Sequence, residues 1–257
     1  MFFINFEKLN KNMNIQKHIP NFITLLNLLS GVFSIYYGMQ GNLQLAGMLI
    51  FLAAVFDFLD GFAARLLHAK SEIGVQLDSL ADMVSFGVAP AFVLFHTINT
   101  LTGTETPDYL PFVAFIVPLF AALRLAKFNV DDSQQTSFKG MPTPAVALLL
   151  ASFPVIILKC LAEDKGIYYD IVTNAYFLAG TGIIASLLMV SNLPMFSLKF
   201  TSISWKENQT RYTFIILSVL FLLMLRVAAV PIIILLYLLL SIVSVIFKNN
   251  PVSIQKD

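Results

Sequence analysis

Charged residues are scarce in this sequence. Only 12% of the 257 residues are Asp, Glu, Lys or Arg, while 58% are hydrophobic; charged residues make up about 25% of a typical soluble domain. This balance excludes an ordinary soluble protein and predicts a chain that lies mostly in a membrane. The net charge of +1 provides no basic surface, so we expect no nucleic-acid partner. The single cysteine, Cys160, excludes a disulfide within the chain.

Long hydrophobic runs are abundant. Those long enough to cross roughly 30 Å of hydrocarbon as helices lie near residues 20–38, 43–65, 74–98, 109–128, 142–160, 171–191, 211–226 and 229–247. The runs 211–226 and 229–247 almost join. We interpret Arg226 and Pro231 as a polar break that turns them into a hairpin of two helices. The sequence therefore predicts an all-α, polytopic transmembrane helical bundle. We expect eight crossings, or six or seven if the last pair is shallow.

Positive charges predict the orientation of these crossings. With the N-terminus in the cytoplasm, 13 of the 16 Lys and Arg residues fall on the cytoplasmic side, and only Lys159, Lys165 and Arg226 fall outside. This is a strong positive-inside bias. We expect an integral protein of the cell (inner or cytoplasmic) membrane with both termini in the cytoplasm. Its expected parts are an N-terminal tail or interfacial segment (1–19), a transmembrane domain (20–247) and a C-terminal tail (248–257).

Four aspartates interrupt the second and third runs: Asp57, Asp60, Asp78 and Asp82. A carboxylate at membrane depth costs roughly 2.5–3.5 kcal/mol, so a cation must accompany them. Within each run the spacing is i,i+3 or i,i+4, which places each pair on one helix face. In an antiparallel hairpin with a rise of about 1.5 Å per residue, the four carboxylates converge near the cytoplasmic surface. This geometry predicts hard oxygen ligands for two close divalent metals.

Small residues and one arginine accompany the aspartates. Gly61 and Ala64 adjoin the acidic face and Gly74 opens the third run, which leaves a strip where a ligand can approach the backbone. Arg65, at the surface, is suited to hold a phosphate. Together these features predict a diphosphate site. Interhelical salt bridges fail as an explanation because one arginine cannot neutralise four carboxylates. A cation-transport pathway is disfavoured because the distal crossings hold no matching acidic cluster.

The string Asp57-x2-Asp60-Gly61-x2-Ala64-Arg65-x8-Gly74-x3-Asp78-x3-Asp82 resembles the signature of the CDP-alcohol phosphatidyltransferases, without departure at any fixed position. The resemblance implies two divalent cations, Mg²⁺ or Mn²⁺, on the four aspartates, with Asp82 also acting as the catalytic base. It implies a homodimer in the lipid bilayer. It further implies a CDP-diacylglycerol site that comprises Asn21, Thr24, Gly61, Ala64, Arg65, Ser71 and Gly74. Asn27, one turn beyond Thr24, is as readily explained by an interhelical hydrogen bond.

Three further stretches bear on the acceptor alcohol. Residues 19–31, 85–91 and 124–145 resemble the membrane-embedded phosphatidylserine synthases of this family. That likeness implies transfer of a phosphatidyl group from CDP-diacylglycerol to L-serine, giving phosphatidylserine and CMP. Ser79 favours the same acceptor, since glycerophosphate-using relatives usually have lysine there.

We expect two groups of residues on the acceptor side. Ser85, Phe86 and Gly87 are expected to shape the serine pocket, with packing as the alternative role, foremost for Phe86. Arg124 and Lys127 are expected to hold the lipid phosphate or the serine carboxylate, with surface anchoring as the alternative. The same chemistry with glycerol 3-phosphate or an inositol phosphate is the alternative function. A cation transporter is the distant one.

Overall fold

The structure is a computed structural model that describes residues 18–69, 71–102, 106–130, 138–162, 167–195, 205 and 208–248. Most of the two expected tails, residues 1–17 and 249–257, lies outside these described residues, as does Lys165. His18 and Ile19, expected in the N-terminal segment, already belong to the first described helix. The expected division of the chain into tails and a transmembrane domain therefore stays a prediction.

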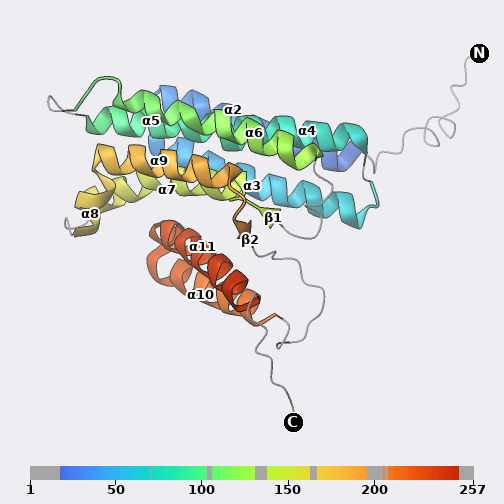
Figure 1. Ribbon diagram of the computed structural model, residues 1–257. Coiled ribbons are helices and arrows are strands. Elements are labelled where there is room, and N and C mark those ends of the chain that lie inside the picture. The colour runs from blue at the N-terminus through green and yellow to red at the C-terminus, as the bar shows by residue number, and fades with distance from the viewer. Residues whose placement is uncertain are drawn as a thin grey trace, which may run out of the picture.

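Helices make up nearly all of the described chain. The bundle holds α2 (His18–Met39), α3 (Leu43–Leu66), α4 (Glu72–Asp82), α5 (Ala89–Leu101), α6 (Ile116–Val130), α7 (Thr143–Ala162), α8 (Ile167–Val172) and α9 (Ala175–Val190). A π-helical segment, Met83–Val88, joins α4 to α5, and a 3₁₀ turn, Leu110–Phe115, precedes α6. A pair of helices, α10 (Gln209–Leu225) and α11 (Ala229–Lys248), lies beside the bundle (Figure 1).

The predicted all-α, polytopic membrane architecture is confirmed. Among the described residues, six helical stretches are long and apolar enough to cross a membrane: His18–Met39, Leu43–Leu66, Glu72–Leu101, Leu110–Val130, Thr143–Leu161 and Gln209–Val243. The sixth run, predicted as one crossing, is divided into α8 and the shorter apolar helix α9. The number of crossings and the side on which the termini lie stay predictions. One short antiparallel ladder was not predicted: β1 (Phe138–Lys139) pairs with β2 (Pro194–Met195).

Polar residues in the gaps between apolar runs set the helix boundaries. The Asn42 side chain accepts a hydrogen bond from Leu45 N at 3.1 Å and caps α3. Gly41 precedes it with φ of +79°, a conformation that glycine adopts without strain. Ser71 caps α4 and Asn174 caps α9 in the same way.

The predicted break between the last two helices is also confirmed. Arg226 ends α10 with a positive φ of +54°, and a short 3₁₀ turn through Ala228 leads into α11. Pro231 lies in the first turn of α11, where its missing N–H costs no helical hydrogen bond. The two helices pack against each other as a hairpin (Figure 1).

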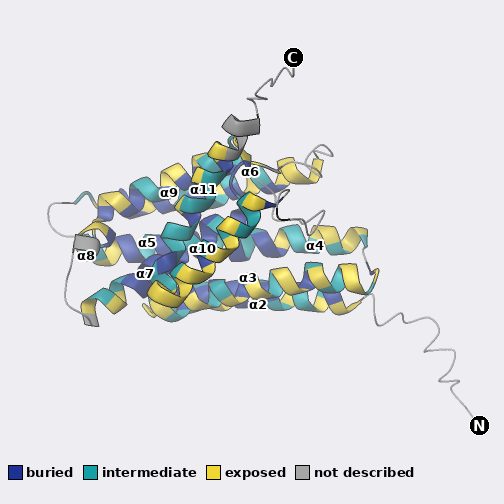
Figure 2. Cartoon of the chain, turned by 90° about the horizontal axis from the view of Figure 1, so that it is seen from below, coloured by how far each residue is buried: buried dark blue, intermediate teal, exposed yellow. Residues whose placement is uncertain are grey.

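Two hydrophobic clusters form the core. The larger one joins α5, α6, α7 and α9, and the smaller one joins α3 and α7 to the helical stretch around Phe86. Small residues allow close packing in the second cluster: a Cβ on Gly47 would lie 2.5 Å from the Ala151 carbonyl oxygen. The outer helix faces carry exposed large apolar side chains, as a lipid-facing surface requires (Figure 2). α4 follows α3 along the chain, and α2 packs against both.

Candidate active site

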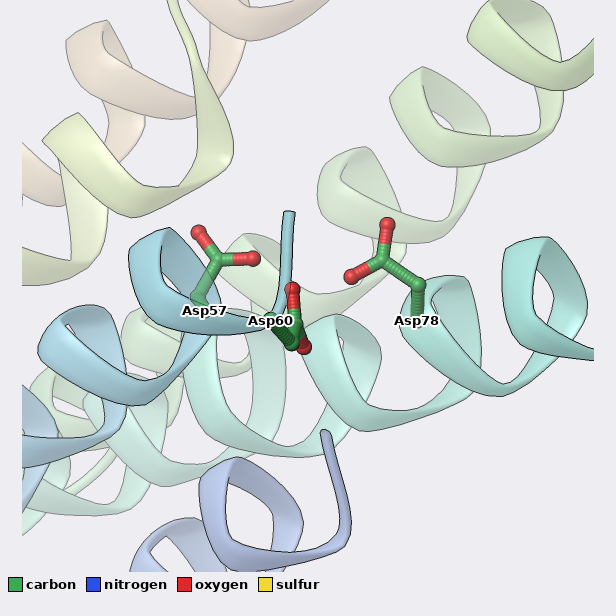
Figure 3. A group of neighbouring side chains, drawn as sticks. All are labelled: Asp57, Asp60 and Asp78. Atoms are coloured by element: carbon green, nitrogen blue, oxygen red, sulfur yellow. The ribbon is translucent and has the colours of Figure 1, made fainter. Parts of the chain in front are cut away.

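Three of the four predicted metal ligands lie together. Asp57 and Asp60 come from the last turns of α3 and Asp78 comes from α4, with Asp60 between the other two (Figure 3). One carboxylate oxygen from each lies within 4.8 Å of the others, close enough to share a metal ion. Oδ2 of Asp60 and Oδ1 of Asp78 are buried and have no hydrogen-bond partner in the described part of the chain. Buried carboxylate oxygens without a donor are costly, so this cluster fits a bound hard cation.

The fourth aspartate lies beside this group, one turn further along. Asp82 is the last residue of α4 and is buried, with 9% of its surface exposed. Its Oδ1 accepts a hydrogen bond from Asn27 Nδ2 at 3.3 Å. The negative charges of Asp57 and Asp78 repel the carboxylate of Asp82. The π-helical segment begins at the next residue, a distortion that is frequent at functional sites.

A pocket of about 260 Å³ opens next to the carboxylates. Asp60 and Asp78 form part of its wall. All seven residues expected to contact CDP-diacylglycerol line it as well: Asn21, Thr24, Gly61, Ala64, Arg65, Ser71 and Gly74. The pocket therefore gathers residues of α2, α3 and the start of α4 around one cavity.

Local backbone geometry shapes this pocket. The Ser71 hydroxyl accepts a hydrogen bond from Gly74 N at 3.0 Å, so the first turn of α4 is capped inside the pocket. A Cβ on Gly74 would lie 2.9 Å from Ser71 Oγ and 3.0 Å from Asn21 Oδ1. A Cβ on Gly61 would meet no protein atom within 4 Å and would project into open space. The N-terminus of α4, with its partial positive charge, suits an anionic group bound here.

The residues expected on the acceptor side separate into two places. Ser85, Phe86 and Gly87 lie in the π-helical segment and are buried in the bundle. Ser85 Oγ donates to the main-chain carbonyl of Asn27 at 3.0 Å, and Phe86 belongs to the smaller hydrophobic cluster. Each of the three thus has a packing contact in the structure, and the expected role in the serine pocket stays a prediction.

Arg124 and Lys127 instead line an open cleft of about 670 Å³ on α6. Arg124 donates to Thr143 Oγ1 at 3.4 Å, and its buried Nε has no hydrogen-bond partner among the described residues. The guanidinium also interacts electrostatically with the carboxylate of Asp82. The cleft therefore offers an anion a partly unpaired cation close to the predicted base.

Several residues of this site were missed by sequence reasoning. Lys139 adds a third cation to the cleft, and Ser191 with Asn192 completes its wall. The β1–β2 ladder brings these segments together, and two-residue strands leave no periodic signal. Tyr237 of α11 interacts electrostatically with Arg124. The two residues are 113 positions apart in the sequence, so no local pattern predicts this interaction. Asn27 was not missed, because the interhelical hydrogen bond expected for it is the one that its Nδ2 donates to Asp82 Oδ1.

Comparison with known sequences identifies the family. The sequence profile described as CDP-alcohol phosphatidyltransferase matches residues 17–243. The chain belongs to the CDP-alcohol phosphatidyltransferase family. The resemblance seen in the aspartate motif is thereby confirmed, and the protein is a membrane-embedded CDP-alcohol phosphatidyltransferase.

Individual relatives of this phosphatidyltransferase share one name. The chain is 32% identical over 240 residues to the CDP-diacylglycerol–serine O-phosphatidyltransferase of Helicobacter pylori strain J99, which covers 93% of this chain and 95% of that protein. The Bacillus subtilis enzyme of that name is 35% identical over 166 residues, 62% of this chain and 89% of that protein. The Saccharomyces cerevisiae enzyme is 34% identical over 199 residues, 67% of this chain and 70% of that protein.

Proposed function

We propose that this phosphatidyltransferase transfers the phosphatidyl group of CDP-diacylglycerol to L-serine and releases CMP. The observation that carries the proposal is the pocket that two clustered carboxylates, Asp60 and Asp78, line together with all seven expected CDP contacts. The names of the relatives favour serine among the possible acceptors. The proposed site faces the cytoplasm of the cell membrane, and the proposed assembly is a homodimer.

Each side of the site has a distinct proposed task. Asn21, Ser71 and Arg65 hold the cytidine diphosphate in the pocket, while Gly61 and Gly74 give it room. The four aspartates hold two divalent cations, Mg²⁺ or Mn²⁺, which supply Lewis-acid stabilisation of the charge that develops on the diphosphate. Arg124, Lys127 and Lys139 attract the serine carboxylate or the lipid phosphate into the cleft.

Asp82 is the proposed general base. Its carboxylate takes the proton of the serine hydroxyl while the serine oxygen bonds to the phosphorus nearer the diacylglycerol. The bond from that phosphorus to the oxygen of CMP breaks, and CMP leaves as the anion. Burial of Asp82 excludes bulk water from the reacting oxygen, which limits hydrolysis of the donor.

Acceptor choice is tested with the purified protein, CDP-diacylglycerol and Mn²⁺ or Mg²⁺. Release of CMP is measured with L-serine, glycerol 3-phosphate and an inositol phosphate in turn. We expect release with serine alone. Release with glycerol 3-phosphate and none with serine would overturn the serine assignment. Ion flux through liposomes without CMP release under any condition would instead identify a transporter.

The proposed mechanism is tested on the same reaction. We expect chelation of divalent metal to stop CMP release, and re-addition of Mn²⁺ or Mg²⁺ to restore it. Asp82→Asn is expected to lower kcat by roughly 10²–10⁴-fold, the range for loss of a general base. Metal-independent release, or full activity of Asp82→Asn, would contradict this mechanism.

A further inference from the structure

Asn27 makes a contact that the mechanism above does not use. It lies in the middle of α2 and is completely buried, with 0% of its surface exposed. Its Nδ2 donates to Asp82 Oδ1 at 3.3 Å, which joins α2 to the end of α4 across 55 residues of sequence. Its own side-chain oxygen, Oδ1, is buried and has no hydrogen-bond partner among the residues that the structure describes.

This unpaired oxygen argues against a role in packing alone. A buried amide oxygen without a donor lowers stability, and an apolar side chain of similar size would avoid that cost. Three other buried polar side chains of α2 avoid this cost, because the hydroxyls of Thr24, Ser30 and Ser34 each donate to a main-chain carbonyl. The amide of Asn27 is thus retained at a cost, and the group that it serves is the carboxylate of Asp82.

The surrounding backbone fixes the amide in this position. The main-chain carbonyl of Asn27 accepts a hydrogen bond from Ser85 Oγ at 3.0 Å, so α2 is tied to the segment that directly follows Asp82. Gly31 makes this approach possible, because a Cβ there would lie 2.5 Å from Ser85 Oγ. The side chain of Asn27 is therefore held beside Asp82 by contacts that do not involve its amide.

We propose that Asn27 is a positioning residue for Asp82. By donating to Oδ1, the amide fixes the rotation of the carboxylate and leaves Oδ2 free to face the metal site and the acceptor hydroxyl. This inference rests on the proposed function for the role of Asp82 as a base. Side chains that orient metal-binding carboxylates typically change metal affinity or activity by about 10–100-fold when they are removed.

Two variants of the full-length protein separate positioning from packing. Asn27→Leu removes the donor and the unpaired oxygen but keeps the number of side-chain heavy atoms, whereas Asn27→Ala also leaves a cavity. We expect kcat for CMP release to fall by about 10–100-fold in both, with little change in KM for CDP-diacylglycerol. The unfolding temperature is expected to fall in both variants, because each leaves Asp82 Oδ1 without its donor, and to fall further in Asn27→Ala because of the cavity. Ser34→Ala removes another buried polar group of α2 and should leave kcat unchanged.

A second readout needs no substrate. Titration of the purified protein with Mn²⁺, followed by the paramagnetic signal of the free ion, is expected to show weaker binding to Asn27→Leu than to the wild-type protein. Wild-type kcat and Mn²⁺ binding in Asn27→Leu would overturn the inference, as would a loss of kcat that follows the unfolding temperature across the two variants. If the wild-type protein releases no CMP with serine, the proposed function fails, and the Mn²⁺ titration still decides the role of Asn27.

Discussion

At the scale of single residues, the energetics of the site are dominated by carboxylates that lack partners. Asp60 is 5% exposed, and no described residue donates a hydrogen bond to its Oδ2. Asp57 and Asp78 lie within 4.8 Å of it, so three negative groups repel one another in a medium of low dielectric constant. A bound divalent cation would reverse the sign of this interaction. The metal-free protein should therefore be less stable than the loaded one.

Asp60→Asn tests whether repulsion among the carboxylates destabilises the metal-free protein. The substitution removes one buried charge, so we expect the unfolding temperature of the metal-free protein to rise and its increase on addition of Mn²⁺ to shrink. CMP release should fall by roughly 10²–10³-fold, the usual loss for one electrostatic group of an active site. Differential scanning fluorimetry with and without Mn²⁺ provides the measurement. Asp170→Asn, the same change at an exposed position on α8, should alter neither quantity. A lower unfolding temperature in metal-free Asp60→Asn would contradict the argument.

Gly61 offers a matched test of the pocket. A Cβ on Gly61 or on Gly180 meets no protein atom within 4 Å, and both residues lie inside helices. Alanine should therefore stabilise the protein at both positions, by about 0.5–1 kcal/mol. Only Gly61 lines the pocket, so Gly61→Ala should raise KM for CDP-diacylglycerol about tenfold, equivalent to about 1.4 kcal/mol of lost binding. An unchanged KM in Gly61→Ala would show that this face of α3 does not contact CDP-diacylglycerol.

At the scale of helices, the spacing of α2 and the π-helical segment depends on Gly31. A Cβ there would lie 2.5 Å from Ser85 Oγ and 2.8 Å from Ser85 Cα. Gly31→Ala should push the two elements apart and lower the free energy of unfolding by about 1–3 kcal/mol. Gly38→Ala on the same helix is the control, because its nearest contact would be Ala46 Cβ at an ordinary 3.8 Å. Equal stability of the two variants in detergent unfolding would contradict the close approach.

Helices were also the level at which sequence reasoning worked best. Hydropathy locates a crossing because every residue of an apolar run contributes to the signal, and each predicted run coincides with a helix or a pair of helices. The motif placed Asp57, Asp60 and Asp78 on facing helices because i,i+3 and i,i+4 spacing fixes a helix face. The π-helical segment after Asp82 escaped prediction because one wider turn leaves the apolar pattern almost unchanged. An interhelical hydrogen bond of Asn27 was expected as one explanation and is present, but its partner Asp82 was not predicted because the partner depends on how α2 packs against α4.

At the scale of the whole molecule, the orientation in the membrane decides which compartment supplies the acceptor. The turn between α2 and α3 and the loop between α3 and α4 lie at opposite ends of α3. The carboxylate cluster lies near the second of these ends, beside Arg65. The distribution of Lys and Arg predicts that this end faces the cytoplasm, where serine is available.

Labelling of single cysteines tests that orientation in intact cells. Cys160→Ser provides a background without cysteine, since the chain has only one. Gln40→Cys and His68→Cys then place one exposed thiol at each end of α3. We expect a membrane-impermeant maleimide to label Gln40→Cys from outside and to reach His68→Cys only after permeabilisation. The two positions lie at the ends of one helix of 24 residues, about 36 Å long, so they report on opposite faces of the bilayer. Labelling of His68→Cys in intact cells would place the active site outside and contradict the cytoplasmic supply of serine.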